Sequence, residues 1–216
     1  MKLINQTVTS RLTILLLFVL TIGGCALTGM ERAEDTRTTM ETMENDIKMA
    51  TQQLEATNAS LNNLMRPGQT DVQQAFNSYS ENVSKMEEME NKFAKHSEEM
   101  KAQGKEYFSE WKKEGKEYTN PEIQQLSNER RSELEETYSK ISENSIGVSE
   151  AFKTYVSNIS EIQTYLSTDL TTKGITAISP ISKKVISSGS KLKSAIQDVQ
   201  TAIRDAQAEM AIDGTN

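Results

Sequence analysis

Apolar and small residues recur along most of this chain in alternating steps of three and four. The pattern is most regular in residues 134–166, where the positions that follow it are Leu134, Tyr138, Ile141, Ser145, Val148, Phe152, Tyr155, Ile159, Ile162 and Leu166. Such spacing places side chains on one face of an α-helix and averages a heptad repeat. The sequence therefore predicts a long helix over this segment, with one face buried against other helices.

Three further segments carry the same spacing. They are residues 31–65, residues 72–118 and a last helix that ends near residue 212. Arg66-Pro67-Gly68 and Asn120-Pro121 interrupt the pattern, and an asparagine followed by proline also suits the start of a helix. Ser179-Pro180 is expected to break or kink the helical segment there, and the last helix is expected to continue from it to about residue 212.

Four helices with short connections predict an all-α fold, namely an elongated antiparallel bundle with coiled-coil-like heptad packing and a long central helical hairpin. The expected bundle covers residues 31–212, and residues 213–216 are expected to form a frayed tail. Residues 31–65 carry a net charge of −4 and residues 173–204 one of +5. The first and last helices of an up-down bundle are neighbours, so these opposite charges favour the predicted order.

Two details of the pattern carry structural predictions. In residues 72–118 the spacing is expected to slip by a few residues near Met86 to Met89, in the manner of a stammer. Beyond the slip, Tyr107 and Trp111 continue the apolar seam. In the last helix Gly189 stands where a large core residue is expected, so either a neighbour approaches closely or the helix bends there.

The helix lengths predict a projecting hairpin. The first helix is about 35 residues long and the two middle helices about 50, so residues 105–133 are expected to extend past it as two helices alone. This hairpin points back towards the end of the bundle where the first helix starts. Its candidate contacts with a membrane surface or a partner are Phe108, Trp111, Lys112, Lys113 and Lys116. Packing in the seam is the alternative for Trp111, whereas Phe108 lies off the seam in this register.

Residues 1–24 are typical of an export signal. Lys2 and Arg11 give the amino end a positive charge, and the apolar run that follows, about 11 residues, is too short for a comfortable membrane span. The run ends in Leu-Thr-Ile-Gly-Gly-Cys at residues 20–25, which resembles a bacterial lipobox. The alternatives are an ordinary signal peptide and an uncleaved anchor. A lone cysteine has no internal disulfide partner, however, and at this place it is better explained as an acylated residue.

The lipobox resemblance implies cleavage before Cys25, which would carry the covalent lipid and become the first residue of the mature chain. Residues 25–30 would then tether the bundle to a membrane, and several acyl chains would make that attachment close to permanent. Ala26 is not the aspartate that commonly retains lipoproteins in the inner membrane. The resemblance therefore implies a protein anchored in the outer membrane and facing the periplasm.

The net charge of the chain narrows the classes of molecule that it is expected to bind. The whole chain has 24 basic and 31 acidic side chains. Without Lys2 and Arg11 the mature part keeps 22 basic residues against the same 31 acidic ones, a net charge of −9. Such a surface opposes binding to nucleic acid or to anionic lipid.

No catalytic, cofactor or metal site is expected. His96 is the only histidine, and without cysteine partners it cannot build the usual zinc site, so we expect a surface residue next to the seam. The sequence contains no activated-serine motif, phosphate-binding glycine loop or His-Glu-x-x-His motif. Methionines at apolar positions are expected to fill the core, with a methionine-rich binding groove as the alternative. We therefore predict that the protein is not an enzyme and carries no cofactor besides the lipid on Cys25.

One stretch of the body matches a family pattern. Its residues are Glu110-Trp111, Glu117-Tyr118, Asn120-Pro121, Arg130-Arg131 to Tyr138, and Leu166 to Leu170 before Ala177-Ile178. Through them, residues 111–178 resemble a family of bacterial lipoproteins known as the domain of unknown function numbered twenty-nine fifty-nine. The family has no established activity, so the resemblance implies shape and location only.

These observations leave two classes of function. The first is a non-enzymatic, outer-membrane-anchored bundle with a structural or protein-interaction role, whose partners would be envelope proteins or a second copy of the chain. The alternative is a small-molecule-binding or sensing bundle in the periplasm, since helical bundles hold ligands between their helices. The unbroken seam of residues 134–166 leaves little room for such a ligand.

Overall fold

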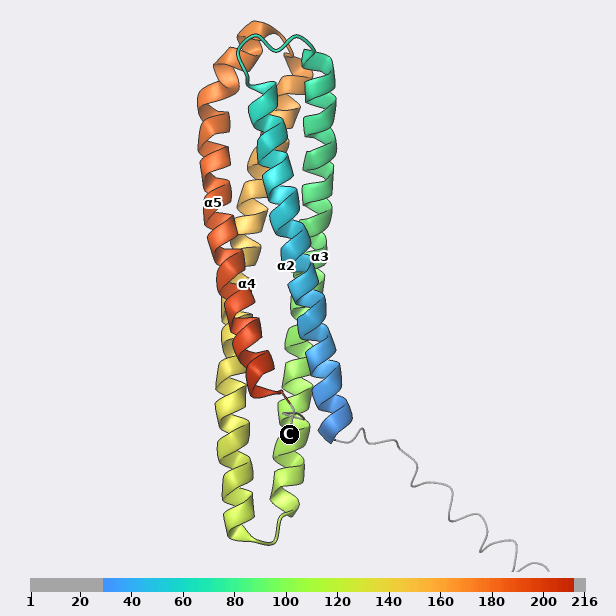
Figure 1. The fold of residues 1–216 in the computed structure, drawn as a ribbon, viewed down its shortest axis with the longest axis vertical. Coiled ribbons are helices and arrows are strands. Elements are labelled where there is room, and N and C mark those ends of the chain that lie inside the picture. Colours follow the sequence, from blue (N-terminus) through green and yellow to red (C-terminus); the bar gives the residue numbers. More distant parts are fainter. Residues whose placement is uncertain (1–28, 212–216) are drawn as a thin grey trace, which may run out of the picture.

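The computed structural model describes residues 29–211. Their elements are α2 (Gly29–Leu64), α3 (Val72–Glu114), the short 3-10 helix η1 (Gly115–Glu117), α4 (Pro121–Thr168) and α5 (Thr172–Glu209). The four long helices run up and down in one elongated bundle, with α3 and α4 forming the longest hairpin (Figure 1). The predicted all-α bundle is confirmed. The proposed signal peptide, Cys25 and the tail at 213–216 lie outside the described residues.

Each helix packs against its neighbours in the chain, and α2 closes the ring against α5. Two ion pairs join these two helices. Lys193 Nζ lies 2.6 Å from Glu55 Oε1, and Arg204 Nε lies 3.6 Å from Glu44 Oε1. Exposed pairs of this kind contribute up to about 1 kcal/mol each. The predicted adjacency of the acidic first helix and the basic last helix is therefore confirmed.

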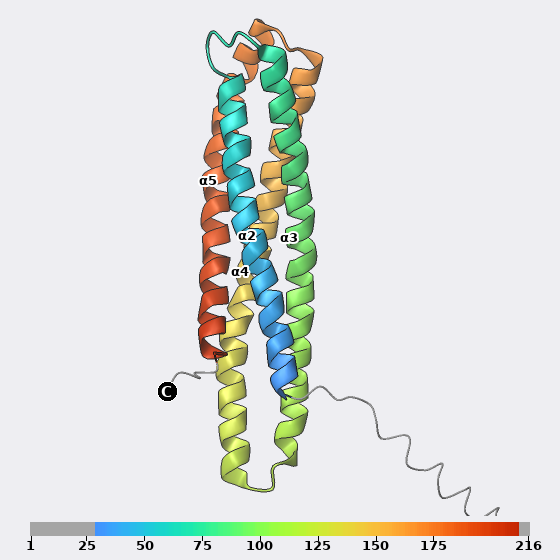
Figure 2. The ribbon, with the colours of Figure 1, turned by 45° about the vertical axis from the view of Figure 1, so that its right-hand side comes forward.

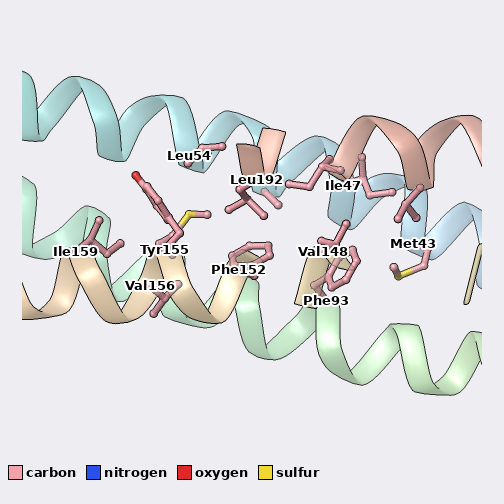
Figure 3. Packing of buried hydrophobic residues seen from close by; sticks show 14 of the residues in the cluster. Met43, Ile47, Leu54, Phe93, Val148, Phe152, Tyr155, Val156, Ile159 and Leu192 are labelled. Carbon is pink, nitrogen blue, oxygen red and sulfur yellow. The ribbon is translucent and has the colours of Figure 1, made fainter. Parts of the chain in front are cut away.

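The core follows the α4 pattern closely. All ten positions predicted for its buried face are buried, and side chains from the other three helices fill the space around them (Figure 3). Phe93 of α3 and Phe152 of α4 meet with ring centroids 6.0 Å apart. Burying a large apolar side chain contributes about 1.5–3 kcal/mol, so this continuous seam is the main source of stability.

Two buried tyrosines join α3 and α4 through their hydroxyl groups. The Tyr79 hydroxyl donates to the Ile159 carbonyl at 2.7 Å, and the Tyr138 hydroxyl to the Met100 carbonyl at 2.6 Å. Burial raises the pKa of both phenols, which therefore stay protonated and keep donating. A buried hydroxyl without such a partner would cost stability, so these bonds fix the register of α3 against α4.

Close helix contacts explain two glycines. A Cβ added at Gly104 would lie 2.1 Å from Tyr138 Cε1, so the Tyr138 ring rests directly on the α3 backbone. A Cβ at Gly189 would lie 3.2 Å from both Leu54 Cδ1 and Tyr155 Cε2. Of the two explanations offered for Gly189, the close approach of neighbours is therefore the one that the structure shows.

The last helix is longer than the sequence predicted. α5 begins at Thr172, where the Thr171 side chain accepts a hydrogen bond from the Gly174 amide at 3.1 Å, and it continues through Pro180. Proline has a φ angle suited to a helix and removes one hydrogen bond. Burial of Ile178 and Ser182 on either side holds the helix together, and its first turns lean across the end of the bundle (Figure 1). Of the break or kink expected at Ser179-Pro180, the break is therefore wrong, because one helix runs through Pro180.

The expected phase slip in α3 is also wrong. The buried positions Val83, Met86 and Phe93 keep heptad spacing, with Glu90 at the place between the last two. Burial raises the pKa of this half-buried carboxyl group. The charged Glu90 interrupts the apolar pattern in the sequence, whereas the heptad spacing itself continues through it.

Candidate functional site at the end of the α3–α4 hairpin

The end of the α3–α4 hairpin is a well-ordered turn. The Asn120 side chain caps α4 by accepting from the Glu122 amide at 2.9 Å, with Pro121 as the first helical residue, as the sequence predicted. Across the hairpin, Trp111 Nε1 donates to Ser127 Oγ at 3.0 Å. These contacts join the last turn of α3 to the first turns of α4, so the end of the hairpin is held as one unit.

The hairpin projects beyond the other two helices (Figure 2). Arg32, near the start of α2, lies beside Gln103, Glu106 and Tyr107, and its guanidinium reaches Glu114 Oε1 at 2.5 Å. The predicted projection at 105–133 is therefore too long on the α3 side. The reason is that α2 begins at Gly29, two residues earlier than expected, and carries a long side chain along α3.

Glu209 marks the end of α5 on the other side of the hairpin. Its carboxylate accepts from Thr137 Oγ1 at 2.6 Å and pairs with Arg130 Nη1 at 3.2 Å, while Arg130 Nη2 donates to its carbonyl at 2.6 Å. The hydrogen bond from Thr137, aided by Arg130, lowers the pKa of Glu209. Beyond Arg130, α4 has only α3 and η1 beside it among residues 29–211.

The sequence predicts an exposed Phe108, but the structure buries this side chain. Its side chain is 5 % exposed, and its ring packs edge-on against Tyr138 with centroids 5.6 Å apart. Met100, Gly104 and Phe108 are successive buried positions four residues apart, and two steps of four in a row rotate the buried face of a heptad helix. The extra step puts Phe108 in the core and moves Tyr107 to its edge.

The other predicted contact residues divide into two groups. Trp111 is half-buried against the core, with its ring 5.7 Å from that of Tyr107, so the seam alternative describes its position. Lys112, Lys113 and Lys116 are exposed. Lys113 pairs with Glu110 on its own helix, whereas Lys112 and Lys116 have no ion pair among residues 29–211.

The exposed apolar residues of the hairpin end were missed. Tyr118 is 45 %, Ile123 47 % and Leu126 65 % exposed. The sequence does contain a signal for the two aliphatic residues. Counted back from Leu134 in steps of three and four, the buried face of the helix includes Ser127 but neither Ile123 nor Leu126. They instead continue the side of α4 that faces α5 at Arg130 and Thr137, beyond the point where α5 ends.

His96 is placed differently from the prediction as well. It is only partly exposed, and its Nδ1 pairs with Oδ2 of Asp46, which is 5 % exposed on α2. A histidine oriented by a carboxylate is a component of many catalytic sites, but such sites also need a nucleophile or substrate group within hydrogen-bonding reach. Within residues 29–211 Asp46 is the only hydrogen-bond partner of His96, so the pair joins α2 to α3.

Two further features bear on the kind of site. Residues 29–211 contain no group of three or more histidine, cysteine, aspartate or glutamate side chains arranged to hold a metal ion. Over the same residues, none of the helices has the length and apolar character needed to cross a bilayer.

The model of the family described as "Protein of unknown function (DUF2959)" matches residues 27–212, which include all four long helices, and the chain belongs to this family. The family named on the resemblance of residues 111–178 is thereby confirmed. Comparison with curated proteins gave no match, and comparison with solved structures gave none either.

Proposed function

We propose that this member of the DUF2959 family is a lipoprotein anchored in the outer membrane through Cys25, with a non-enzymatic bundle that serves a structural or protein-interaction role in the periplasm. The observation that carries the proposal is the position of α2, which begins at Gly29, four residues after the lipobox cysteine. Because the folded body starts within a few residues of the acylated cysteine, the lipid would hold it close to the membrane.

The use of polar groups supports a role without catalysis. His96, Tyr79 and Tyr138, which in an enzyme could move protons, each spend their hydrogen bond on a neighbouring helix. Exposed charged side chains form pairs one helical turn apart, such as Lys85 with Glu81 and Arg37 with Glu34. Such a surface suits a soluble rod that presents its sides or its ends to other molecules.

The small-molecule alternative has less support. A ligand held between the helices would occupy the centre of the bundle, where the ten seam positions of α4 are buried against the other helices. A thermal-shift screen with small metabolites tests it, and a reproducible rise in Tm with one chemical class would favour that function over ours.

The anchor is tested by Cys25→Ala in cells fed an acyl-chain analogue with a clickable tag. We expect loss of the label and release of a folded helical protein from the membrane fraction. Ala26→Asp is the matched control, because it keeps the acylated cysteine and should move the labelled protein to the inner membrane. Unchanged membrane association of the Cys25→Ala protein would refute the anchor.

The interaction role is tested by crosslinking in cells through a photoreactive residue placed at exposed positions of the hairpin end and of the bundle sides. We expect a discrete crosslinked product with an envelope protein or with a second copy of the chain. A full set of positions that gives only uncrosslinked protein would count against the interaction role.

A further inference from the structure

Two features of the molecule lie at the same end. α2 starts there, at Gly29, and the α3–α4 hairpin reaches past that point (Figures 1 and 2). Arg32 lies level with residues 103–107 of α3, so Gly29 is roughly level with residue 109, and at 1.5 Å per residue the hairpin end at Tyr118 lies about 14 Å further on.

The chain before α2 limits how far this end can stand from a membrane. Four residue steps join Cys25 to Gly29, and a chain extends at most about 3.5 Å per residue, which gives a reach of about 14 Å. This reach equals the projection of the hairpin. An upright bundle anchored through Cys25 therefore brings the hairpin end at least to the bilayer surface, even when those four steps are fully extended.

The chemistry of the hairpin end suits that position. Tyr118, Ile123 and Leu126 are exposed there, whereas most large apolar side chains elsewhere in the bundle are buried. A tyrosine and two aliphatic residues at one end of a hairpin, with the exposed lysines Lys112 and Lys116 a few residues before them in the sequence, are a combination typical of the boundary between headgroups and acyl chains.

Charge adds a constraint on the lipid. In residues 112–126 the lysines at 112, 113 and 116 are balanced by the glutamates at 114, 117 and 122. The contact is therefore apolar in origin and needs no anionic lipid, unlike the basic surfaces that bind acidic headgroups. Its strength should change little with ionic strength.

A second copy of the chain is the competing occupant. Ile123 and Leu126 continue the side of α4 that α5 covers, so a helix from another molecule could pack there. The short connection to Cys25 favours the membrane, because it holds these residues at the bilayer whether or not a second molecule is near.

We propose that Tyr118, Ile123 and Leu126 insert into the headgroup region of the membrane that carries the Cys25 lipid, giving the bundle a second point of contact and an upright orientation. The inference rests on the proposed lipid anchor. It assigns the hairpin end, rather than the sides of the bundle, to the membrane.

The test uses the acylated full-length protein in vesicles of zwitterionic phospholipid with brominated acyl chains. Trp111 is the only tryptophan, so Trp111→Phe with Tyr118→Trp places a single fluorescent reporter at the hairpin end. The matched control is Trp111→Phe with Tyr165→Trp, since Tyr165 is also partly exposed and lies near the opposite end of α4. We expect bromine to quench the residue-118 reporter several-fold more than the residue-165 reporter.

Adding Ile123→Ser and Leu126→Ser should reduce quenching at residue 118 to the level of the control reporter, with acylation and vesicle association unchanged. Quenching at 118 should persist when the salt concentration is raised tenfold. Equal quenching of both reporters would mean that the bundle lies flat, and no quenching of either would mean that it stands off the surface. Either result overturns the proposal while leaving the anchor intact.

Failure of the anchor would be seen separately, as the missing mass of the acyl chains before the protein is added to vesicles. Self-association is measured with the unacylated Cys25→Ala protein that also carries Trp111→Phe and Tyr118→Trp, by recording its tryptophan fluorescence as the protein concentration rises. A concentration-dependent blue shift that Ile123→Ser and Leu126→Ser remove would assign the surface to a second copy and overturn the membrane contact.

Discussion

The two ends of α4 differ in what surrounds them. In the four-helix part Phe152 is fully buried and packs against Phe93, whereas Leu126, on the same helix, is 65 % exposed. Both are large apolar residues on a long amphipathic helix. The difference arises because α5 ends at Glu209, which leaves the first turns of α4 with α3 and η1 as their only neighbours in the part of the chain that the structure describes. Burial by neighbours, and not residue type, therefore separates the residues that stabilise the fold from those available for contact.

The largest expected effect comes from truncating one residue in each region. Phe152→Ala should lower the free energy of unfolding by about 3–5 kcal/mol, because it leaves a cavity among four helices. Leu126→Ala should change it by less than about 0.5 kcal/mol, since the side chain is mostly in water already. Urea unfolding followed by circular dichroism measures both. Similar losses for the two variants would show that the hairpin end is part of the folding core.

Replacing each of two glycines by alanine tests how contact with neighbouring side chains affects stability, with a smaller expected change in the free energy of unfolding. Gly104→Ala should destabilise the protein by about 1–3 kcal/mol, because the new methyl group meets the Tyr138 ring. Gly147→Ala should stabilise it by up to about 1 kcal/mol, since nothing lies within 4 Å of that Cβ and alanine favours a helix. The same unfolding measurement compares them. A stabilising Gly104→Ala would mean that Tyr138 can move away at little cost.

The smallest effect on stability is expected for the contact between Glu209, at the end of α5, and Arg130 of α4, where the four-helix part of the bundle meets the hairpin end. At pH near 7, Glu209→Gln should lower the free energy of unfolding by less than about 1 kcal/mol, because the charged contact with Arg130 is partly exposed. The folded state lowers the pKa of Glu209, so its contribution is complete above the unfolded value of about 4.3 and is lost as the pH falls through the lower folded value.

Unfolding of wild type and Glu209→Gln at several pH values between about 7 and 3 measures this change as a difference, in which the other carboxylates cancel. The difference should shrink towards zero at the acid end. A difference that stays constant with pH would mean that the packing of the side chain, and not its charge, holds the end of α5.

Much of the fold could be predicted from the sequence because helix formation and heptad spacing are local. The buried face of α4, the cap at Asn120 and the pairing of α2 with α5 all came from spacing, turn residues and charge. The family also could be named from the body of the chain, since its resemblance rests on residues of the hairpin, of α4 and of the first turns of α5.

The errors arose where position depends on several helices at once. Phe108 moved into the core because two steps of four rotate the face of α3, and no local signal fixes where such a rotation falls. Pro180 predicts a break or a kink, and burial of its neighbours decides against the break because it keeps the helix continuous. His96 was assigned to the surface because its partner Asp46 is fifty residues away in the sequence.

The sequence by itself determined that this chain forms four long amphipathic helices with turns at Pro67 and Pro121, because side-chain spacing and proline act within one or two helical turns. Only the tertiary structure decided which apolar residues remain outside. That outcome depends on where α2 begins and α5 ends relative to the α3–α4 hairpin, which the packing of all four helices sets together. Tyr118, Ile123 and Leu126 are exposed at the lipobox end for this reason.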